Sequence, residues 1–159
     1  MTQRIDYQQQ SPELFKKLVE FSFALRTSVI EQSIRDLVEI RASQINGCAF
    51  CVDMHVKEAT MHGERALRLH HVATWRESTL FSPRERAALA WTEILTRIPA
   101  EGVPDDVYER VRTQLSEKEL SDLTFQVMSI NAWNRVNVGF RVVPGTYDKA
   151  FGVDKSGLE

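Results

Sequence analysis

The sequence predicts an all-α protein with a single domain. Apolar residues recur every three or four positions in successive segments, Ser-Pro, Ser-x-x-Glu and Gly signals mark helix ends, and no stretch alternates like a β-strand. A chain of 159 residues is large enough to bury a core without disulfide bonds or structural metal ions. We expect one domain over residues 1–159, with a helical core over about 11–143 and a poorly ordered tail over 144–159.

The first half of the chain predicts four helices. Ser11-Pro12 begins the first, because serine is a good N-cap and proline is tolerated at the first helical position. Asn46-Gly47 ends the second, and Gly63 follows the end of the third. The predicted ranges are about 11–26, 28–46, 48–61 and 64–75.

The second half predicts three more helices. Ser82-Pro83-Arg84-Glu85 has the pattern of a capping box and starts a helix that reaches Thr96. A loop with Pro99 and Gly102 follows, and then a helix over about 105–114. A second capping box, Ser116 to Glu119, starts a long helix that ends before Pro144-Gly145.

The composition narrows the classes of function. A net charge of −2 gives no electrostatic reason to bind nucleic acid or an anionic membrane. No segment approaches the ~18 consecutive apolar residues of a membrane span, and the first residues contain no apolar core of a signal peptide. The two cysteines lie three residues apart, unlike a secreted disulfide framework. We therefore expect a cytoplasmic protein.

The motif with the most chemical content is EIRASQINGCAFCVDMH, which spans residues 39–55. It contains both cysteines, Cys48 and Cys51, with His55 four residues after the second and Glu39 before the first. If a helix begins at Cys48, then Cys48, Cys51 and His55 fall at i, i+3 and i+7 and share one face of that helix. Residues four apart on a helix lie roughly 5–6 Å apart at Cβ.

These residue types favour thiol redox chemistry. A thiol attacks only as thiolate, and the N-terminal end of a helix favours thiolate through its free N–H groups and dipole. His55 can accept the proton of Cys51, and Glu39 can orient the imidazole or extend a proton relay. Residues three apart in a helical turn also have the Cα separation that a disulfide needs.

Two other interpretations of the motif stay open. Cys48, Cys51, His55 and Glu39 together have the donor types of a zinc site. The cysteines can also be an inert buried pair, which leaves His55 and Glu39 without a role. A strongly helical chain does not need zinc to fold, so we expect no metal ion.

The segments QINGCAFCVDMH, WRESTLFSPRERAALAWTE and NAWNRVNVGFR resemble the alkylhydroperoxidase AhpD-like family of the carboxymuconolactone decarboxylase superfamily. The resemblance implies a helical homo-oligomer, a trimer or hexamer, with the cysteine helix near a subunit interface. It also implies that Cys51 attacks peroxide, that Cys48 resolves, and that His55 and Glu39 relay protons. The best-studied branch has a longer spacer before the first cysteine and a histidine in place of Ala49-Phe50.

The predicted function is that of a thiol-dependent alkyl hydroperoxide reductase. Phe50, Val52 and Met54 next to the cysteines favour an organic hydroperoxide as substrate, and a dithiol protein or a small thiol would reduce the enzyme again. No residue pattern points to a nucleotide, flavin or haem cofactor. The alternatives are a lyase of the same superfamily and a non-enzymatic redox sensor.

Several other residues have weaker predictions. Histidines outside the motif are interpreted as surface or satisfied core groups, although the role of His71 is not defined. The tryptophans are interpreted as core or interface aromatics, and Asp53 as a solvated acid. Side chains on the long helix are expected to bond across subunits or to lie in solvent. These residues are His62, His70 and His71; Trp75, Trp91 and Trp133; and Asn131, Asn134 and Arg135.

Overall fold

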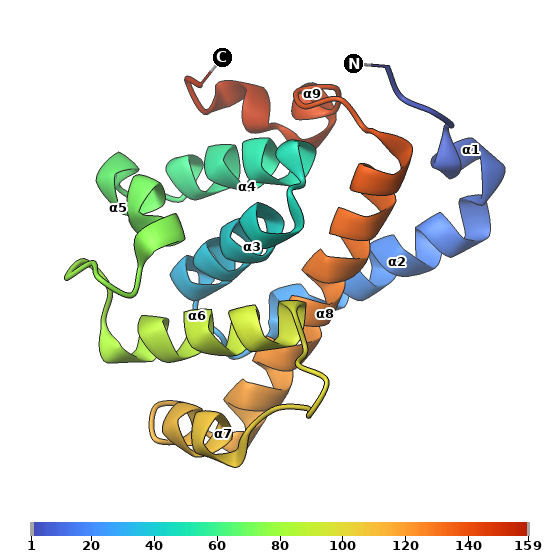
Figure 1. Cartoon of the computed structure of the whole chain (residues 1–159). Helices are drawn as coiled ribbons and strands as arrows, with labels where there is room; N and C mark the ends of the chain where they lie inside the picture. The colour runs from blue at the N-terminus through green and yellow to red at the C-terminus, as the bar shows by residue number, and fades with distance from the viewer. Residues whose placement is uncertain (1, 159) are drawn as a thin grey trace.

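A computed structural model describes residues 2–158, and all regular structure in this range is helical (Figure 1). The all-α prediction is confirmed for this part of the chain. Residues 1 and 159, which the domain and tail predictions include, lie outside the described residues. The elements are α1 (Tyr7–Gln10), α2 (Pro12–Ala24), η1 (Leu25–Thr27), α3 (Gln32–Asn46), α4 (Ala49–Met61), α5 (Ala66–His71), η2 (Val72–Thr74), α6 (Pro83–Thr96), α7 (Asp105–Arg112), α8 (Glu117–Phe140), α9 (Asp148–Phe151) and η3 (Val153–Lys155).

Helix α3 lies at the centre of the bundle and packs against α4, α6 and α8 (Figure 1). Its buried residues belong to three apolar clusters. Val38 faces α6, α7 and α8, Leu37 joins the cluster with α5 and Trp75, and Ala42 lies with the two cysteines. Because α3 contributes to all three clusters, its C-terminal end is held firmly where the cysteine motif begins.

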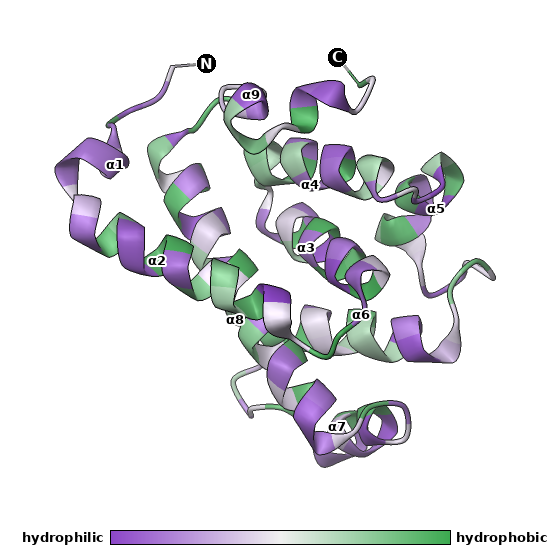
Figure 2. Ribbon diagram, turned by 180° about the vertical axis from the view of Figure 1, so that it is seen from behind, coloured by the Kyte–Doolittle hydropathy of each residue, from purple (hydrophilic) through white to green (hydrophobic). Residues whose placement is uncertain are grey.

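Both predicted capping boxes are present. Ser82 accepts a hydrogen bond from the N–H of Glu85 while the Glu85 carboxylate accepts one from the N–H of Ser82, and Ser116 and Glu119 do the same at α8. At the periphery, hydrophilic residues dominate α1 and α7 (Figure 2). Within residues 2–158, no helix combines the length and apolar character needed to cross a membrane.

The start of α3 and the presence of α1 differ from the prediction. Helix α3 begins at Gln32 instead of near Ser28, because Ser28 and Glu31 are extended and the Ser28 hydroxyl accepts a hydrogen bond from the N–H of Ile30. The short α1 has no counterpart in the prediction. It starts at Asp6, whose carboxylate accepts hydrogen bonds from the next two free N–H groups.

The predicted poor order of the tail does not match its structure. Within residues 144–158, two short helical elements pack against α4. Asp148 accepts a hydrogen bond from the buried Lys57 at 2.7 Å, and Val153 is only 2% exposed. The ring of Tyr147 packs edge to face on Phe50 next to the cysteines. An ion pair and aromatic contacts thus hold a segment that lacks strong helical periodicity.

Candidate active site

The turn between α3 and α4 places the first cysteine at a helix start. Gly47 ends α3 in the left-handed region, with a φ of +66°, which glycine adopts at little cost. Cys48 is therefore the N-cap of α4, and its Sγ accepts a hydrogen bond from the N–H of Cys51 at 3.3 Å. A sulfur in this position receives a backbone donor and the positive end of the helix dipole.

The second cysteine faces α8. Asn137 donates a hydrogen bond from Nδ2 to the Sγ of Cys51 at 3.3 Å. Cys48 and Cys51 are each 1% exposed and both are free thiols. The pair is thus enclosed between the start of α4 and one face of α8.

The two sulfurs are electrostatically coupled. Hydrogen bonds from the thiol and backbone N–H of Cys51, only partly opposed by burial, lower the pKa of Cys48 to about 7. The hydrogen bond to Cys48 raises the pKa of Cys51 well above its usual range, and burial adds to this rise. The environment of Cys48 therefore favours its thiolate form, whereas that of Cys51 favours the neutral thiol.

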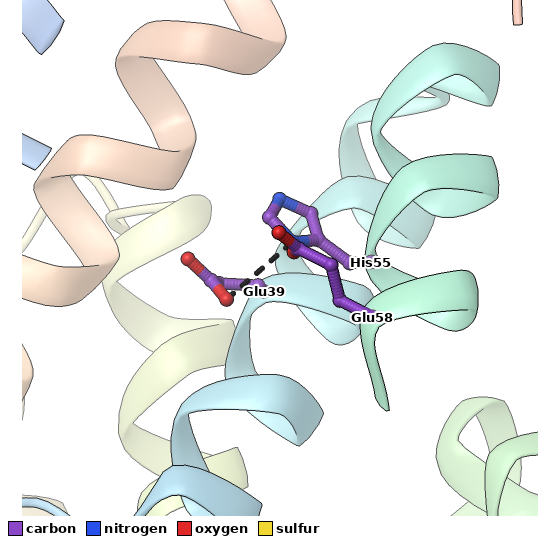
Figure 3. Close-up of side chains that lie close together, drawn as sticks. All are labelled: Glu39, His55 and Glu58. Carbon is purple, nitrogen blue, oxygen red and sulfur yellow. Dashed lines mark hydrogen bonds and ion pairs between the residues drawn. The ribbon is translucent and has the colours of Figure 1, made fainter. Parts of the chain in front are cut away.

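An acid–base cluster forms between α3 and α4 (Figure 3). The Nδ1 atom of His55 lies 2.8 Å from Oε2 of Glu58 and 3.4 Å from Oε2 of Glu39. Gln126 on α8 donates a hydrogen bond to the other oxygen of Glu39 at 2.8 Å. The imidazole thus lies between a carboxylate from α3 and one from its own helix.

Burial and neighbouring charges shift all three of these groups. Burial alone would lower the pKa of His55, but the negative charges of Glu39 and Glu58 raise it to about 9. Burial raises the pKa of Glu39 to about 7 despite the opposing charge of His55. Burial also acts on Glu58, but the hydrogen bond from His55 leaves its pKa below the usual value. The cluster holds a protonated imidazole at neutral pH and a carboxyl group that titrates close to it.

The donor set of this cluster also resembles a metal site. One donor atom from each of Glu39, His55 and Glu58 lies within 4.8 Å of the others, a set that a divalent cation accepts. Among residues 2–158, no such group of three includes a cysteine, so the four residues considered as zinc ligands do not form one cluster. The Nδ1 atom of His55 already forms a short hydrogen bond with Glu58. This contact favours a role of the cluster in proton transfer over a role in metal binding.

A cavity of about 620 Å³ opens beside the first cysteine. Cys48 lines it together with apolar Ala49, Val52 and Pro144 and the acidic Asp53, whereas Cys51 does not contribute to the lining. Asp53, which the sequence predicts to be a solvated acid, has a side chain that is 29% exposed and also accepts a hydrogen bond from Lys57. Access from solvent is thus closer to Cys48 than to Cys51.

A network of buried amides connects α8 to the turn before the cysteines. Asn46 donates hydrogen bonds to Oδ1 of Asn131 and of Asn134, at 3.0 and 2.8 Å. Asn134 in turn donates to the hydroxyl of Ser43. The prediction that Asn131 and Asn134 bond across subunits or lie in solvent is wrong, because both are buried and bonded within this chain. Arg135 donates to the backbone and side-chain oxygens of Asn131.

His62, His71 and the tryptophans have structural partners, and His70 is exposed. His62 bonds to Asp36, and His71 lies 3.0 Å from the hydroxyl of Ser78. Trp75 and Trp91 are buried in the core, as predicted. Trp133 donates a hydrogen bond to Ser22 on α2.

The structure brings Cys48 next to Cys51 and Glu39 next to His55, as the motif suggests, and adds two residues that the sequence analysis does not include. Glu58 follows His55 by three positions, so helical spacing alone was a signal for their contact. Asn137 lies in NAWNRVNVGFR, where three asparagines recur every third residue along α8. That spacing marks one helix face but does not reveal which element the face contacts.

The fold and the cysteine pair define an AhpD-like protein. A solved structure from Agrobacterium tumefaciens, ATU0492, described as a protein of unknown function and a candidate antioxidant defence protein AhpD, is 40% identical with a TM-score of 0.88, over 91% of this chain and 99% of that one. An uncharacterised peroxidase-related protein with an alkylhydroperoxidase AhpD core from Ralstonia eutropha shares the fold at 18% identity, with a TM-score of 0.78 over 87% of this chain and 74% of that one.

Sequence comparison gives the family. The model of the carboxymuconolactone decarboxylase family matches residues 12–93. The uncharacterised protein YdfG of Bacillus subtilis is 40% identical over 138 residues, which cover 87% of this chain and 94% of that protein. The chain belongs to the carboxymuconolactone decarboxylase family.

Proposed function

We propose that this protein is a thiol-dependent alkyl hydroperoxide reductase that uses Cys51 and Cys48 as a redox-active dithiol. The observation that carries the proposal is the pair of thiols at the start of α4, where the Sγ of Cys48 accepts a hydrogen bond from the N–H of Cys51 and the pKa of Cys48 is lowered to about 7. The description of ATU0492 as a candidate antioxidant defence protein supports the same class of activity.

In the first step, the Cys51 proton moves to Cys48 and the Cys51 thiolate attacks the outer oxygen of the hydroperoxide. The S–O bond forms as the O–O bond breaks, which gives a sulfenic acid on Cys51 and an alkoxide. His55 donates its proton to the alkoxide, because a pKa of about 9 keeps the imidazole protonated at neutral pH. Glu39, whose pKa is about 7, then takes up a proton from solvent and passes it to His55.

In the second step, Cys48 gives up the proton that it took from Cys51, and its sulfur attacks the sulfur of the sulfenic acid. The S–S bond forms as the S–O bond breaks, and the Cys48 proton goes to the leaving hydroxide, which departs as water. A dithiol protein or a small thiol then reduces the disulfide by exchange and is itself oxidised. The mixed disulfide would form at Cys48, the sulfur beside the cavity.

The lining of the cavity supports an organic hydroperoxide as the substrate. Ala49, Val52 and Pro144 present apolar surface beside Cys48, which suits an alkyl or aryl group better than a charged one.

The test measures consumption of cumene hydroperoxide with dithiothreitol as the reductant. We expect wild type to turn over repeatedly and Cys51→Ser to be inactive. Cys48→Ser, assayed without dithiothreitol, should stop after one equivalent with a sulfenic acid that dimedone traps. If Cys51→Ser consumes peroxide as fast as wild type, the assignment of the nucleophile is wrong.

A lyase is the second candidate function, because Glu39, His55 and Glu58 form an acid–base cluster that does not itself require the cysteines. Alkylation with iodoacetamide distinguishes the two: a lyase keeps its activity after both thiols are blocked, and a peroxidase loses it. A redox sensor would consume one equivalent of peroxide and then stop even with dithiothreitol present.

A further inference from the structure

The buried amide of Asn137 has a contact that packing does not require. Its side chain is on α8, it belongs to a residue only 4% exposed, and its Nδ2 atom donates to the Sγ of Cys51 at 3.3 Å. A neutral thiol is a weak hydrogen-bond acceptor, whereas a thiolate is a strong one. A donor fixed at this distance therefore stabilises the charged form of the sulfur more than the neutral form.

The orientation of the amide is held from its other end. The hydroxyl of Tyr7 donates to Oδ1 of Asn137 at 3.3 Å, which leaves Nδ2 directed at the sulfur. Tyr7 is itself fixed, because its ring stacks on Phe140 at 5.7 Å between centroids and meets Phe15 edge to face at 5.9 Å. Burial raises the pKa of Tyr7, so the hydroxyl remains a donor at neutral pH.

We propose that Asn137 is a catalytic residue that stabilises negative charge on the Sγ of Cys51, and that Tyr7 is a positioning residue that fixes the amide in the donating orientation. The inference rests on the proposed function in one respect, the assignment of Cys51 as the sulfur that attacks peroxide. It also supports that assignment, because the contact with Cys48 and burial raise the pKa of Cys51, whereas the hydrogen bond from Asn137 lowers it.

The neighbouring asparagine has a different set of partners. Asn134 bonds to Asn46 and Ser43, which ties α8 to the end of α3, and its amide also lowers the pKa of both cysteines. Asn131 bonds to Thr96 and to the backbone of Val127, with no contact to either sulfur. Three asparagines on one helix face thus differ in what they touch, and Asn131 offers a matched control for Asn137.

The test uses the Cys48→Ser background, in which Cys51 is the only thiol. The rate of alkylation by iodoacetamide is measured against pH, and its midpoint reports the pKa of Cys51 without any peroxide. In this background we expect Asn137→Leu to raise the midpoint by about one unit, which means about tenfold slower alkylation at a fixed neutral pH. Tyr7→Phe should raise it by a smaller amount, and Asn131→Leu should leave it unchanged.

An unchanged midpoint in a folded Asn137→Leu protein overturns the inference, and so does an equal rise in Asn131→Leu. If Asn137→Leu does not fold by circular dichroism, Tyr7→Phe decides, because it removes one hydroxyl from a half-buried ring; no rise then overturns the inference. Failure of the proposed function gives a different result, a normal midpoint shift in a protein that does not reduce peroxide.

Discussion

At the scale of the single residue, His55 is defined by the two carboxylates around it. Its pKa of about 9 in the folded protein lies above the ~6.5 of an unfolded chain, so the folded state binds the proton more tightly. The stability from this interaction is fully present below pH ~6.5 and is lost as the pH rises through about 9.

We therefore expect the free energy of unfolding of wild type to fall by the order of 2 kcal/mol relative to that of His55→Gln between pH ~6.5 and ~9.5. The comparison with the variant is needed because the lowered pKa of Cys48 acts in the opposite direction over this range in both proteins. Urea denaturation at both pH values measures the change. His55→Gln should show a clearly smaller fall, since glutamine does not titrate. Equal slopes in the two proteins would contradict the pKa assigned to His55. Glu39 adds to the fall mostly at lower pH, because its raised pKa is about 7.

Glu58 has a separable effect on the same imidazole. Glu58→Gln keeps a hydrogen-bond acceptor near Nδ1 but removes a negative charge 2.8 Å away. We expect the pKa of His55 to fall by about one unit, as read from the NMR titration of its ring protons. Peroxide reduction should then lose rate above neutral pH, where less imidazolium remains. Glu101→Gln, in the exposed loop before α7, should leave the titration unchanged.

At the scale of the element, the turn between α3 and α4 determines where the sulfurs lie. A Cβ on Gly47 would meet no atom within 4 Å, so the only cost of a side chain there is the left-handed backbone. We expect Gly47→Ala to lower the free energy of unfolding by about 1 kcal/mol. Gly139→Ala is the matched control, because Gly139 also has open space but lies within helix α8.

Gly139→Ala should stabilise the protein by about 0.5–1 kcal/mol, since alanine is the better helix former. Urea denaturation of both variants checks the opposite signs. Gly47→Ala should also slow alkylation of Cys48, whose place at the start of α4 depends on this turn. Destabilisation by both variants to the same extent would mean that backbone conformation is not the cause.

The helices could be predicted where the signal is local. Ser82 with Glu85 and Ser116 with Glu119 specify helix starts through bonds between neighbours in the chain, and Gly47 specifies a stop through its own backbone. The start of α3 was misplaced because the extended turn at Ser28 closes with a side-chain bond that helical periodicity does not reveal.

The site could be predicted only in part for a related reason. Glu39, Cys48, Cys51 and His55 lie within one short motif, so their spacing indicates proximity. Asn137 is 86 positions from Cys51, and the distance between them depends on how α8 packs on α4. No pattern within a single segment contains that information.

At the scale of the whole molecule, the outer surface of α2 and α8 is unusually apolar. No residue of α2 is buried within residues 2–158, although the helix is amphipathic. Phe21 and Phe125 pack edge to face between the two helices, and Leu14, Phe23 and Met128 are each more than half exposed. An exposed apolar surface of this kind favours contact with another protein surface.

We expect this surface to join copies of the chain, as the family resemblance implies for a trimer or hexamer. Size-exclusion chromatography with light scattering measures the mass. Phe23→Glu together with Met128→Glu should reduce it to that of the 18.3 kDa monomer, whereas Lys17→Glu, an exposed charge on the same helix, should not. A wild-type protein that elutes as a monomer would contradict the expectation.

The ammonium group of Lys57 has a consequence for the integrity of the carboxyl-terminal segment. It belongs to a residue only 6% exposed and is neutralised from two directions, by Asp53 on α4 and by Asp148 beyond the last long helix. A protease that trimmed the chain near Thr146 would remove one counter-ion and uncover the cation and the ring of Phe50. Loss of those few amino acids would therefore loosen the wall next to the sulfurs, so an otherwise intact preparation could lose its chemistry through clipping alone.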